Sequence, residues 1–452
     1  MSGLERARRT IAGIMAAAAV AAVALPVAAQ DATIRLGAPL NAATRNIETL
    51  LDEFTAETGI EVILEGMSTD DLNTKLSIES AAGTGYFDLV RVGPGWLPRL
   101  VEAGWIEPLD ARIKGSDIGI DDFLPSALQV LGKTPGDDRI WAIPVDANTG
   151  MLAYRTDLFD SPEEQAAFRA KYGYDLAPPE TMAQWLDMAE FFTRDTDGDG
   201  ETDLFGMGVG QKGGTPGAIW TLGPLWSFGG ELVDDARFEV VYDSPEAVKA
   251  LEWQRKMQRY MPRSALSWGI YDNVAPMQAG RLAMSVQLFS FTADLLDPEK
   301  SAYHDRIGFS VLPRAEGNPE GYTTGKYVFG GGGIALHADS RNPDAAWTFV
   351  EWMLGKDNAA TLALAGTIAP RRSVMNDPEV LASAPAFKRT LPIFLESLDK
   401  VAMGRPKMSE SSQLLRELSD AWHDVALGNA DPAEAASAAH ADMEAILREA
   451  GY

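Results

Sequence analysis

The chain contains no cysteine, and this absence excludes several kinds of chemistry. No disulfide, thiol nucleophile or zinc–thiolate site can form, and no lipidated cysteine can anchor the protein to a membrane. Histidine is scarce as well, and no two of the four have the spacing of a metal-ligand pair: His304, His337, His423 and His440. Stability must therefore come from buried apolar side chains, and 46% hydrophobic residues are enough to build two lobes.

Positive charge is also in short supply. The 39 lysines and arginines face 65 aspartates and glutamates, which gives a formal net charge of -26. A body of this charge repels nucleic acid and anionic membrane surfaces, so neither is an expected partner. Acidity of this kind serves solubility and does not by itself name a ligand.

Long apolar runs are confined to the amino terminus. Three arginines and one glutamate in residues 5–9 precede an apolar stretch at 11–25, and small residues occupy 27–29. This order is typical of a secretory signal peptide, and the stretch is too short for a usual transmembrane helix. We expect residues 1–29 to be removed, which leaves about 420 residues at a net charge of -28, since the leader carries +2. The mature protein would work in the periplasm, and Arg8-Arg9 leaves a twin-arginine export route open.

Strand and helix patterns alternate at the start of the mature chain. Apolar residues predict strands at 33–36, 61–64 and 87–92, and helical spacing around Leu50 and Leu72 predicts a helix in each interval. This alternation favours a right-handed parallel α/β sheet. The turn at 93–96 follows the third strand, at the sheet edge where ligands gather in such folds.

The later segments occur in a recognisable order. They include Ala103–Leu109, Ile143–Asp146 leading to Tyr154, Pro179–Thr181 before Trp185, Met277–Gly280 before Leu282–Met284, Phe309–Pro313, Gly330–Gly333 before Ile334, and Ala345–Phe349. Together with the βαβαβ start, this order resembles the extracellular solute-binding proteins of ABC sugar importers, the family that includes maltose-binding protein.

The resemblance implies a two-lobed periplasmic-binding-protein fold, in which each lobe is a mostly parallel sheet flanked by helices. Hinge crossings would fall near 146–150, 328–332 and 367–370. The amino-terminal lobe would then comprise residues 30–147 and 331–367, and the carboxy-terminal lobe residues 148–330 and 368–452. The glycines at 330–333 have two explanations: freedom at a crossing that must bend, or a bulge packed closely against a neighbour.

A cleft that binds sugars needs polar side chains for hydroxyls and aromatic rings for the C–H faces. Candidates in the segments expected at the cleft are Asn41, Trp96, Asp146, Asn148, Trp226, Trp268, Tyr271, Phe289, Lys326, Tyr327, Arg371 and Arg372. By the resemblance, Asp146 matches a ligand-contacting carboxylate, and Phe289 lies where the family often has a stacking tryptophan. Any single tryptophan has the alternative of being a core residue.

An acidic loop is the sharpest local motif. Carboxylates alternate with other residues, followed by glycine, as in the first half of an EF-hand: Asp195, Asp197, Asp199, Glu201 and Asp203. The twelfth position is Gly206 instead of the usual bidentate glutamate. The loop is therefore either a structural calcium site or an acidic turn held by its own Asx bonds.

These observations predict a monomeric, non-catalytic binding protein that needs no cofactor beyond structural calcium. It would deliver a carbohydrate or polyol to the permease of an ABC importer by closing its two lobes around the ligand. The alternative is a secreted glycoside hydrolase with paired carboxylates, since acidic residues are abundant. A binder of another solute, such as a polyamine or an iron chelate, is a third possibility.

Overall fold

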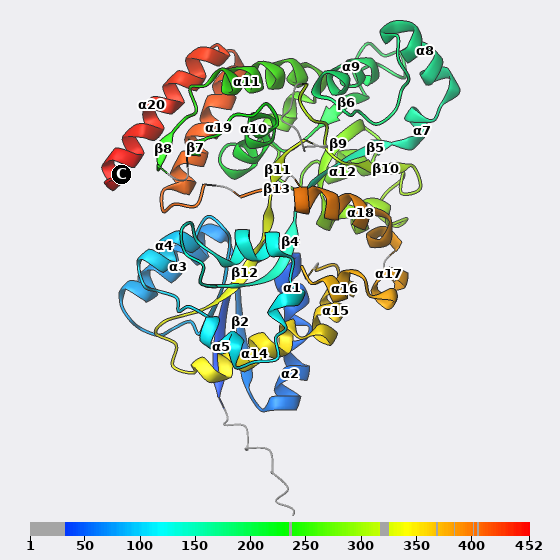
Figure 1. Cartoon of the computed structure of the whole chain (residues 1–452). Helices are drawn as coiled ribbons and strands as arrows, with labels where there is room; N and C mark the ends of the chain where they lie inside the picture. Colours follow the sequence, from blue (N-terminus) through cyan, green and yellow to red (C-terminus); the bar gives the residue numbers. More distant parts are fainter. Residues whose placement is uncertain are drawn as a thin grey trace, which may run out of the picture.

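The computed structural model describes residues 32–234, 237–316, 325–367, 369–383, 385–400, 402–404 and 406–452. The predicted leader lies outside the described residues. Within them, no helix combines the length and the apolar character that a membrane crossing requires. Figure 1 shows two α/β bodies, one above the other, connected by strands that pass between them.

The first lobe, lower in Figure 1, contains a five-stranded sheet in the order β2-β1-β3-β12-β4. Its strands are β1 (Thr33–Pro39), β2 (Glu61–Met67), β3 (Leu89–Val92), β4 (Ile143–Asn148) and β12 (Gly330–Leu336). β1 is parallel to β2 and β3, whereas β12 is antiparallel to both β3 and β4. The helices of this lobe are α1 (Ala42–Glu48), α2 (Leu51–Thr58), α3 (Thr69–Ala81), α4 (Leu97–Glu102), α5 (Asp110–Lys114), α14 (Pro343–Leu354) and α15 (Lys356–Leu364).

The second lobe contains a four-stranded sheet in the order β10-β5-β9-β6. Its strands are β5 (Gly150–Arg155), β6 (Phe205–Gly208), β9 (Leu282–Leu288) and β10 (Ile307–Ser310). Only β6 and β9 are parallel. The surrounding helices are α7 (Thr156–Phe159), α8 (Pro162–Tyr172), α9 (Met182–Phe192), α10 (Thr215–Ser227), α11 (Pro245–Met257), α12 (Val274–Gln278), α13 (Thr292–Leu296), α18 (Pro385–Lys400), α19 (Ser411–Leu427) and α20 (Pro432–Ala450).

The two-lobed α/β architecture is confirmed, but the prediction of mostly parallel sheets is wrong for the second lobe. The reason lies in the crossings. β4 leaves the first lobe at its carboxyl end, so β12, which re-enters from the second lobe, must run the opposite way. In the same manner β5 enters the second lobe at the edge where β9 ends, and Gly150 pairs with Leu288. Strands that cross between lobes therefore make both sheets mixed.

Local sequence signals place the element boundaries. Gly59 ends α2 with φ 74°, a left-handed conformation that favours glycine. Thr181 begins α9 with a reciprocal capping box to Gln184, as the segment 179–181 predicted. Apolar residues at helical spacing form the buried face of α19, including Leu414, Leu418 and Trp422.

The lobe boundaries after residue 367 stay a prediction. Helices α16 (Arg372–Met375) and α17 (Pro378–Ser383) contact α15 of the first lobe, whereas α18 contacts β5 and β10 of the second. A parallel pair of short strands, β11 (Tyr327–Val328) and β13 (Ala402–Met403), lies between the lobes in Figure 1.

His337, just after β12, makes stability depend on pH. The ring is 2% exposed, its Nδ1 accepts from the Asp339 amide at 3.1 Å, and its Nε2 lies 2.7 Å from Ser80 Oγ. Nε2 therefore carries the proton and donates to Ser80, and burial lowers the pKa of His337 against the opposing effect of nearby Asp339 and Asp88. The unfolded chain binds this proton more readily than the folded one, so the contribution to stability is present above about pH 6.5 and is lost as pH falls below it.

We expect His337→Gln to reduce the fall in melting temperature between pH 7 and pH 5. Thermal unfolding at a series of pH values measures this, with His304→Gln as a control for the loss of a histidine in the other lobe. A pH dependence equal to that of the unmodified protein would contradict this role of His337.

Candidate functional site

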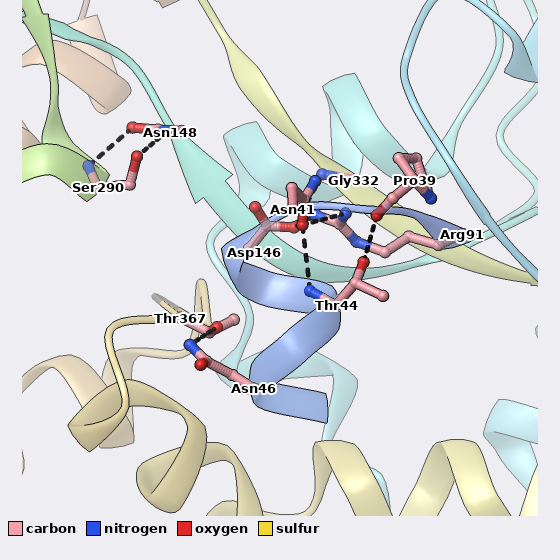
Figure 2. Close-up of polar contacts among 10 residues, drawn as sticks. All are labelled: Pro39, Asn41, Thr44, Asn46, Arg91, Asp146, Asn148, Ser290, Gly332 and Thr367. Atoms are coloured by element: carbon pink, nitrogen blue, oxygen red, sulfur yellow. Dashed lines mark hydrogen bonds and ion pairs between the residues drawn. The ribbon is translucent and has the colours of Figure 1, made fainter. Parts of the chain in front are cut away.

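Polar side chains meet at the edge of the first-lobe sheet that faces the second lobe. β4 continues directly into β5 of the other sheet, so its carboxyl end points across, and β1 and β3 run in the same direction. Figure 2 shows four residues that gather there, which we term the Asp146 cluster: Asn41 after β1, Arg91 on β3, Asp146 on β4 and Gly332 on β12. Each thus comes from a different strand or strand end.

Arg91 is the centre of the Asp146 cluster. Its guanidinium forms an ion pair with Asp146 Oδ1, and Nη1 donates to Asn41 Oδ1 at 3.3 Å. The Gly332 amide also donates to Asp146 Oδ1, at 3.1 Å. The side chains of Arg91 and Asp146 are 5% and 16% exposed. A buried arginine is costly unless it is paired, so Arg91 holds the Asp146 carboxylate in one position.

Asn41 also caps the first helix of the lobe. It is the N-cap of α1, and its Oδ1 accepts from the Thr44 amide at 3.1 Å. A side-chain oxygen at this position satisfies an otherwise unpaired amide of the first helical turn. One amide oxygen therefore connects the start of α1 with Arg91.

Asn148 contacts the second lobe at the first crossing. Its Nδ2 donates to Ser290 Oγ at 2.8 Å, and the Ser290 amide lies 3.4 Å from Asn148 Oδ1 (Figure 2). Ser290 belongs to the short 3₁₀ helix η5 (Phe289–Phe291) after β9. This pair therefore joins the two sheets where the chain passes between them.

The glycines at 330–333 show both an unusual backbone conformation and close packing against neighbours. Gly331 has φ 113°, which an L side chain rarely adopts, and a register irregularity lies between Gly332 and Gly333. A Cβ at Gly332 would lie 3.2 Å from Arg91 Nε, and one at Gly333 2.9 Å from Ala142 Cβ. Gly330 alone is uncrowded, with 3.5 Å to the nearest atom. An added Cβ would thus be crowded at three of the four glycines, all except Gly330, and only Gly331 of the four has a positive φ.

The second lobe presents a small pocket at the corresponding edge of its own sheet. It lies where β6 and β9 end and where α10 begins, and its lining includes no charged side chain: Val209, Gly210, Pro216, Ile219, Ile270, Asn273, Val286, Leu288 and Tyr327. Leu288 pairs with Gly150, the first residue of β5, so this pocket adjoins the crossing that follows β4, the strand that carries Asp146 and Asn148. This lining is uncharged and largely apolar.

Several predicted binding residues lie in the core instead. Trp226 is 2% exposed within α10, and Phe289 is 2% exposed and stacked on Phe394, with ring centroids 4.0 Å apart. Trp226 belongs to the buried core of the second lobe, and Phe289 packs against Phe387 and Phe394 of α18. Lys326 and Tyr327 are also buried, although Tyr327 lines the second-lobe pocket. Burial raises the pKa of Tyr327, so its hydroxyl stays protonated.

The other aromatic candidates keep some exposure. Tyr271 is 61% exposed and lies 5.0 Å from the Phe291 ring, whereas Trp96 and Trp268 are half-buried. Contact of these three rings with a ligand stays a prediction.

The two arginines after residue 370 bind to the first lobe. Arg371 is 5% exposed, donates to Asp122 Oδ2 and to the Ile118 carbonyl at 3.0 Å each, and lies over the Phe123 ring. These partners hold its guanidinium within the first lobe. Arg372 donates to the Asp121 carbonyl at 3.2 Å on the surface.

Sequence reasoning missed Arg91, although a signal was available. It is the one charged residue of β3, whose other members are Leu89, Val90 and Val92. A single charge in an apolar strand that ends at a ligand-binding edge indicates a paired or functional side chain.

The acidic loop divides its five predicted ligands into two groups. Carboxylate oxygens of Asp195, Asp197 and Asp203 lie within 4.8 Å of one another, whereas Asp199 and Glu201 are not part of this group. Backbone hydrogen bonds from Gly200 and Gly198 lower the pKa of Asp195, and hydrogen bonds from Thr196 lower that of Asp203. The Asx bonds of an acidic turn are therefore present, and three carboxylates lie close enough to share a cation.

Stabilisation by calcium stays a prediction. We expect calcium to raise the melting temperature relative to a chelator, because a cation bound only by the folded loop favours the native state. Asp195→Asn should remove this difference, and magnesium serves as the ionic control. Equal melting temperatures in calcium and in chelator would contradict the site.

Comparisons with known proteins identify the family of this chain. Residues 38–360 match the family model of the bacterial extracellular solute-binding proteins. A probable amino-acid ABC transporter periplasmic-binding protein of Sinorhizobium fredii is 24% identical over 96% of this chain and 93% of its own length. The mannitol-binding protein of Pseudomonas aeruginosa is 27% identical over 87% and 86% of the two chains.

A solved structure matches with similar coverage. An ABC transporter solute-binding protein of Agrobacterium radiobacter, crystallised with ribitol, superimposes with a TM-score of 0.78 at 25% identity and covers 92% of this chain and 98% of its own. With two lobes, crossing strands and a polar cluster at the edge between them, the chain belongs to the bacterial extracellular solute-binding protein family.

Proposed function

We propose that this protein is the periplasmic binding component of an ABC importer for a carbohydrate or polyol, and that the ligand lies between the Asp146 cluster and the second-lobe pocket. The observation that carries the proposal is the Asp146 carboxylate, held by Arg91 and Gly332 at the sheet edge that faces the other lobe. A relative named as a mannitol-binding protein and a similar structure crystallised with ribitol support this class of ligand.

Binding would act by shifting a population of conformations. A ligand that contacts both lobes stabilises the arrangement in which they lie close, and a permease can distinguish that closed form. Hydroxyl groups would exchange hydrogen bonds with water for bonds to carboxylate and amide oxygens, while apolar residues of the second-lobe pocket cover the C–H faces. Asn148 and Ser290 connect the lobes beside this site.

The hydrolase alternative has less support. The close pair Ser80 and His337 does not serve as a nucleophile and base, because the ring donates its proton to the serine. The matched family consists of solute-binding proteins.

We also propose that the protein is exported with removal of residues 1–29, has no lipid anchor, is a monomer and docks to a permease in the inner membrane. The test is a thermal-shift screen of the mature protein against monosaccharides, oligosaccharides, polyols and amino acids, followed by calorimetry of each compound that raises the melting temperature. A shift with one class of sugar or polyol supports the proposal. A shift with amino acids alone, or turnover of a chromogenic glycoside, would contradict it.

A further inference from the structure

The Asp146 carboxylate has one committed and one uncommitted oxygen. Oδ1 receives both the Arg91 guanidinium and the Gly332 amide, whereas no described residue donates a hydrogen bond to Oδ2. The side chain is 16% exposed, so a ligand can reach it. An ionised carboxylate only accepts hydrogen bonds, and its partner must therefore be a donor such as a hydroxyl group.

Arg91 is the one cation of the Asp146 cluster, and its guanidinium is already paired within the protein. Its side chain is 5% exposed and it donates to Asp146 and Asn41. A guanidinium fork is well matched to carboxylate ligands, which it binds through two parallel hydrogen bonds. Here Asp146 takes the place that an anionic ligand would otherwise occupy.

We propose that Asp146 makes this site select neutral polyhydroxyl ligands against carboxylic acids of the same carbon skeleton, because it neutralises Arg91 and repels a second carboxylate. The inference rests on the proposed function and names the discriminating residue within that site. The ligand is thus an alditol or aldose, and the rejected compound is the corresponding aldonate. The net charge of -26 on the chain adds to the repulsion of anions.

The consequence is a latent anion site that one substitution exposes. Asp146→Asn keeps the shape of the side chain and an oxygen that can accept from Gly332, but it removes the negative charge. The Arg91 guanidinium then lacks its counter-ion and is expected to attract the carboxylate of an aldonate. The specificity of the site thus depends on the repulsive Asp146 carboxylate as much as on attractive contacts with the ligand.

The experiment is calorimetry on a matched pair of ligands. The alditol or aldose that binds best in the thermal-shift screen is paired with its aldonate, with D-mannitol and D-mannonate as the first pair. We expect the unmodified protein to prefer the neutral compound by about 100-fold or more, since like charges placed together in an interface cost several kcal/mol. Asp146→Asn should lower this preference at least about tenfold, with a measurable gain in aldonate affinity.

Two further variants separate specificity from damage to the fold. Adding Arg91→Met to Asp146→Asn should abolish the gained aldonate binding. Asp157→Asn is the matched control, because Asp157 pairs with Arg155, itself 8% exposed, in the second lobe away from the Asp146 cluster. This control should keep the original preference, and melting curves of all variants verify folding.

The outcomes distinguish failure of this selectivity from failure of the proposed function. Equal affinity of the unmodified protein for both members of the pair would overturn the inference, as would an unchanged preference in Asp146→Asn. In either case the protein still binds a neutral sugar or polyol, so the proposed function stands. If no neutral sugar or polyol binds, the proposed function fails, and the inference fails with it.

Discussion

Replacing Asp146 with alanine is expected to weaken ligand binding by about 1.5–3 kcal/mol, which corresponds to roughly a ten- to hundredfold loss of affinity. The carboxylate lies at the sheet edge between the lobes with one oxygen held by Arg91 and Gly332 and the other open to a ligand hydroxyl. Hydrogen bonds to an ionised group are stronger than neutral ones, so the loss should exceed that of a neutral contact. Isothermal titration calorimetry with the ligand from the screen measures the effect.

The same substitution leaves Arg91 without its carboxylate, so stability must be measured separately. An uncompensated buried charge is destabilising, and a lower melting temperature is expected in the absence of ligand. Asp157→Ala breaks a similar arginine pair in the second lobe and should lower stability without lowering affinity. Unchanged affinity in Asp146→Ala would remove this residue from the binding site.

Gly331→Ala is expected to give the largest loss of stability among substitutions in the glycine run. The φ of 113° at Gly331 alone costs about 1–3 kcal/mol for a residue with a side chain. A Cβ there would also lie 2.1 Å from the Asp146 carbonyl oxygen, which belongs to the backbone and cannot move away freely. Because that backbone carries the Asp146 carboxylate, ligand affinity should fall together with stability.

Gly330→Ala is the matched control for this effect. Gly330 is the preceding residue in the same strand, its nearest non-bonded neighbour would lie 3.5 Å from an added Cβ, and its φ is not positive. We expect its free energy of unfolding to change little. Chemical denaturation of both variants provides the comparison, and similar losses at the two positions would show that conformation and crowding at Gly331 are not the cause.

The elements of the first lobe could be predicted well because their signals are local. Alternation and apolar runs indicated strands at 33–36, 61–64 and 87–92, and β1, β2 and β3 lie there. Gly59, a residue type typical of helix ends, ends α2. The helix predicted around Leu50 is divided into α1 and α2 at that residue, which apolar spacing alone could not show. Such signals act within a few residues and are readable without the fold.

The candidate site could be predicted only in part. Asn41, Asp146 and Asn148 follow or end strands of the first lobe, and their positions and the family resemblance suggested them. Arg91 was missed although it is a lone charge in an apolar strand, and its partners could not be identified because they are distant in sequence: Asp146 lies 55 residues away and Asn41 lies 50 residues away. Burial of the aromatic candidates Trp226 and Phe289 was not foreseen, since it depends on packing that no local pattern reveals.

The sequence by itself determined that the chain lacks thiol chemistry, carries a leader-like start, forms an α/β fold and resembles solute-binding proteins. These properties depend on composition and on short-range periodicity, caps and turns. Only the tertiary structure decided which strands are antiparallel, which glycines are crowded and which charges meet. Asp146 and Gly332 are 186 residues apart and are joined because β12 returns between β3 and β4. Contacts of this kind follow from the packing of whole lobes, and the geometry of the Asp146 cluster arises there.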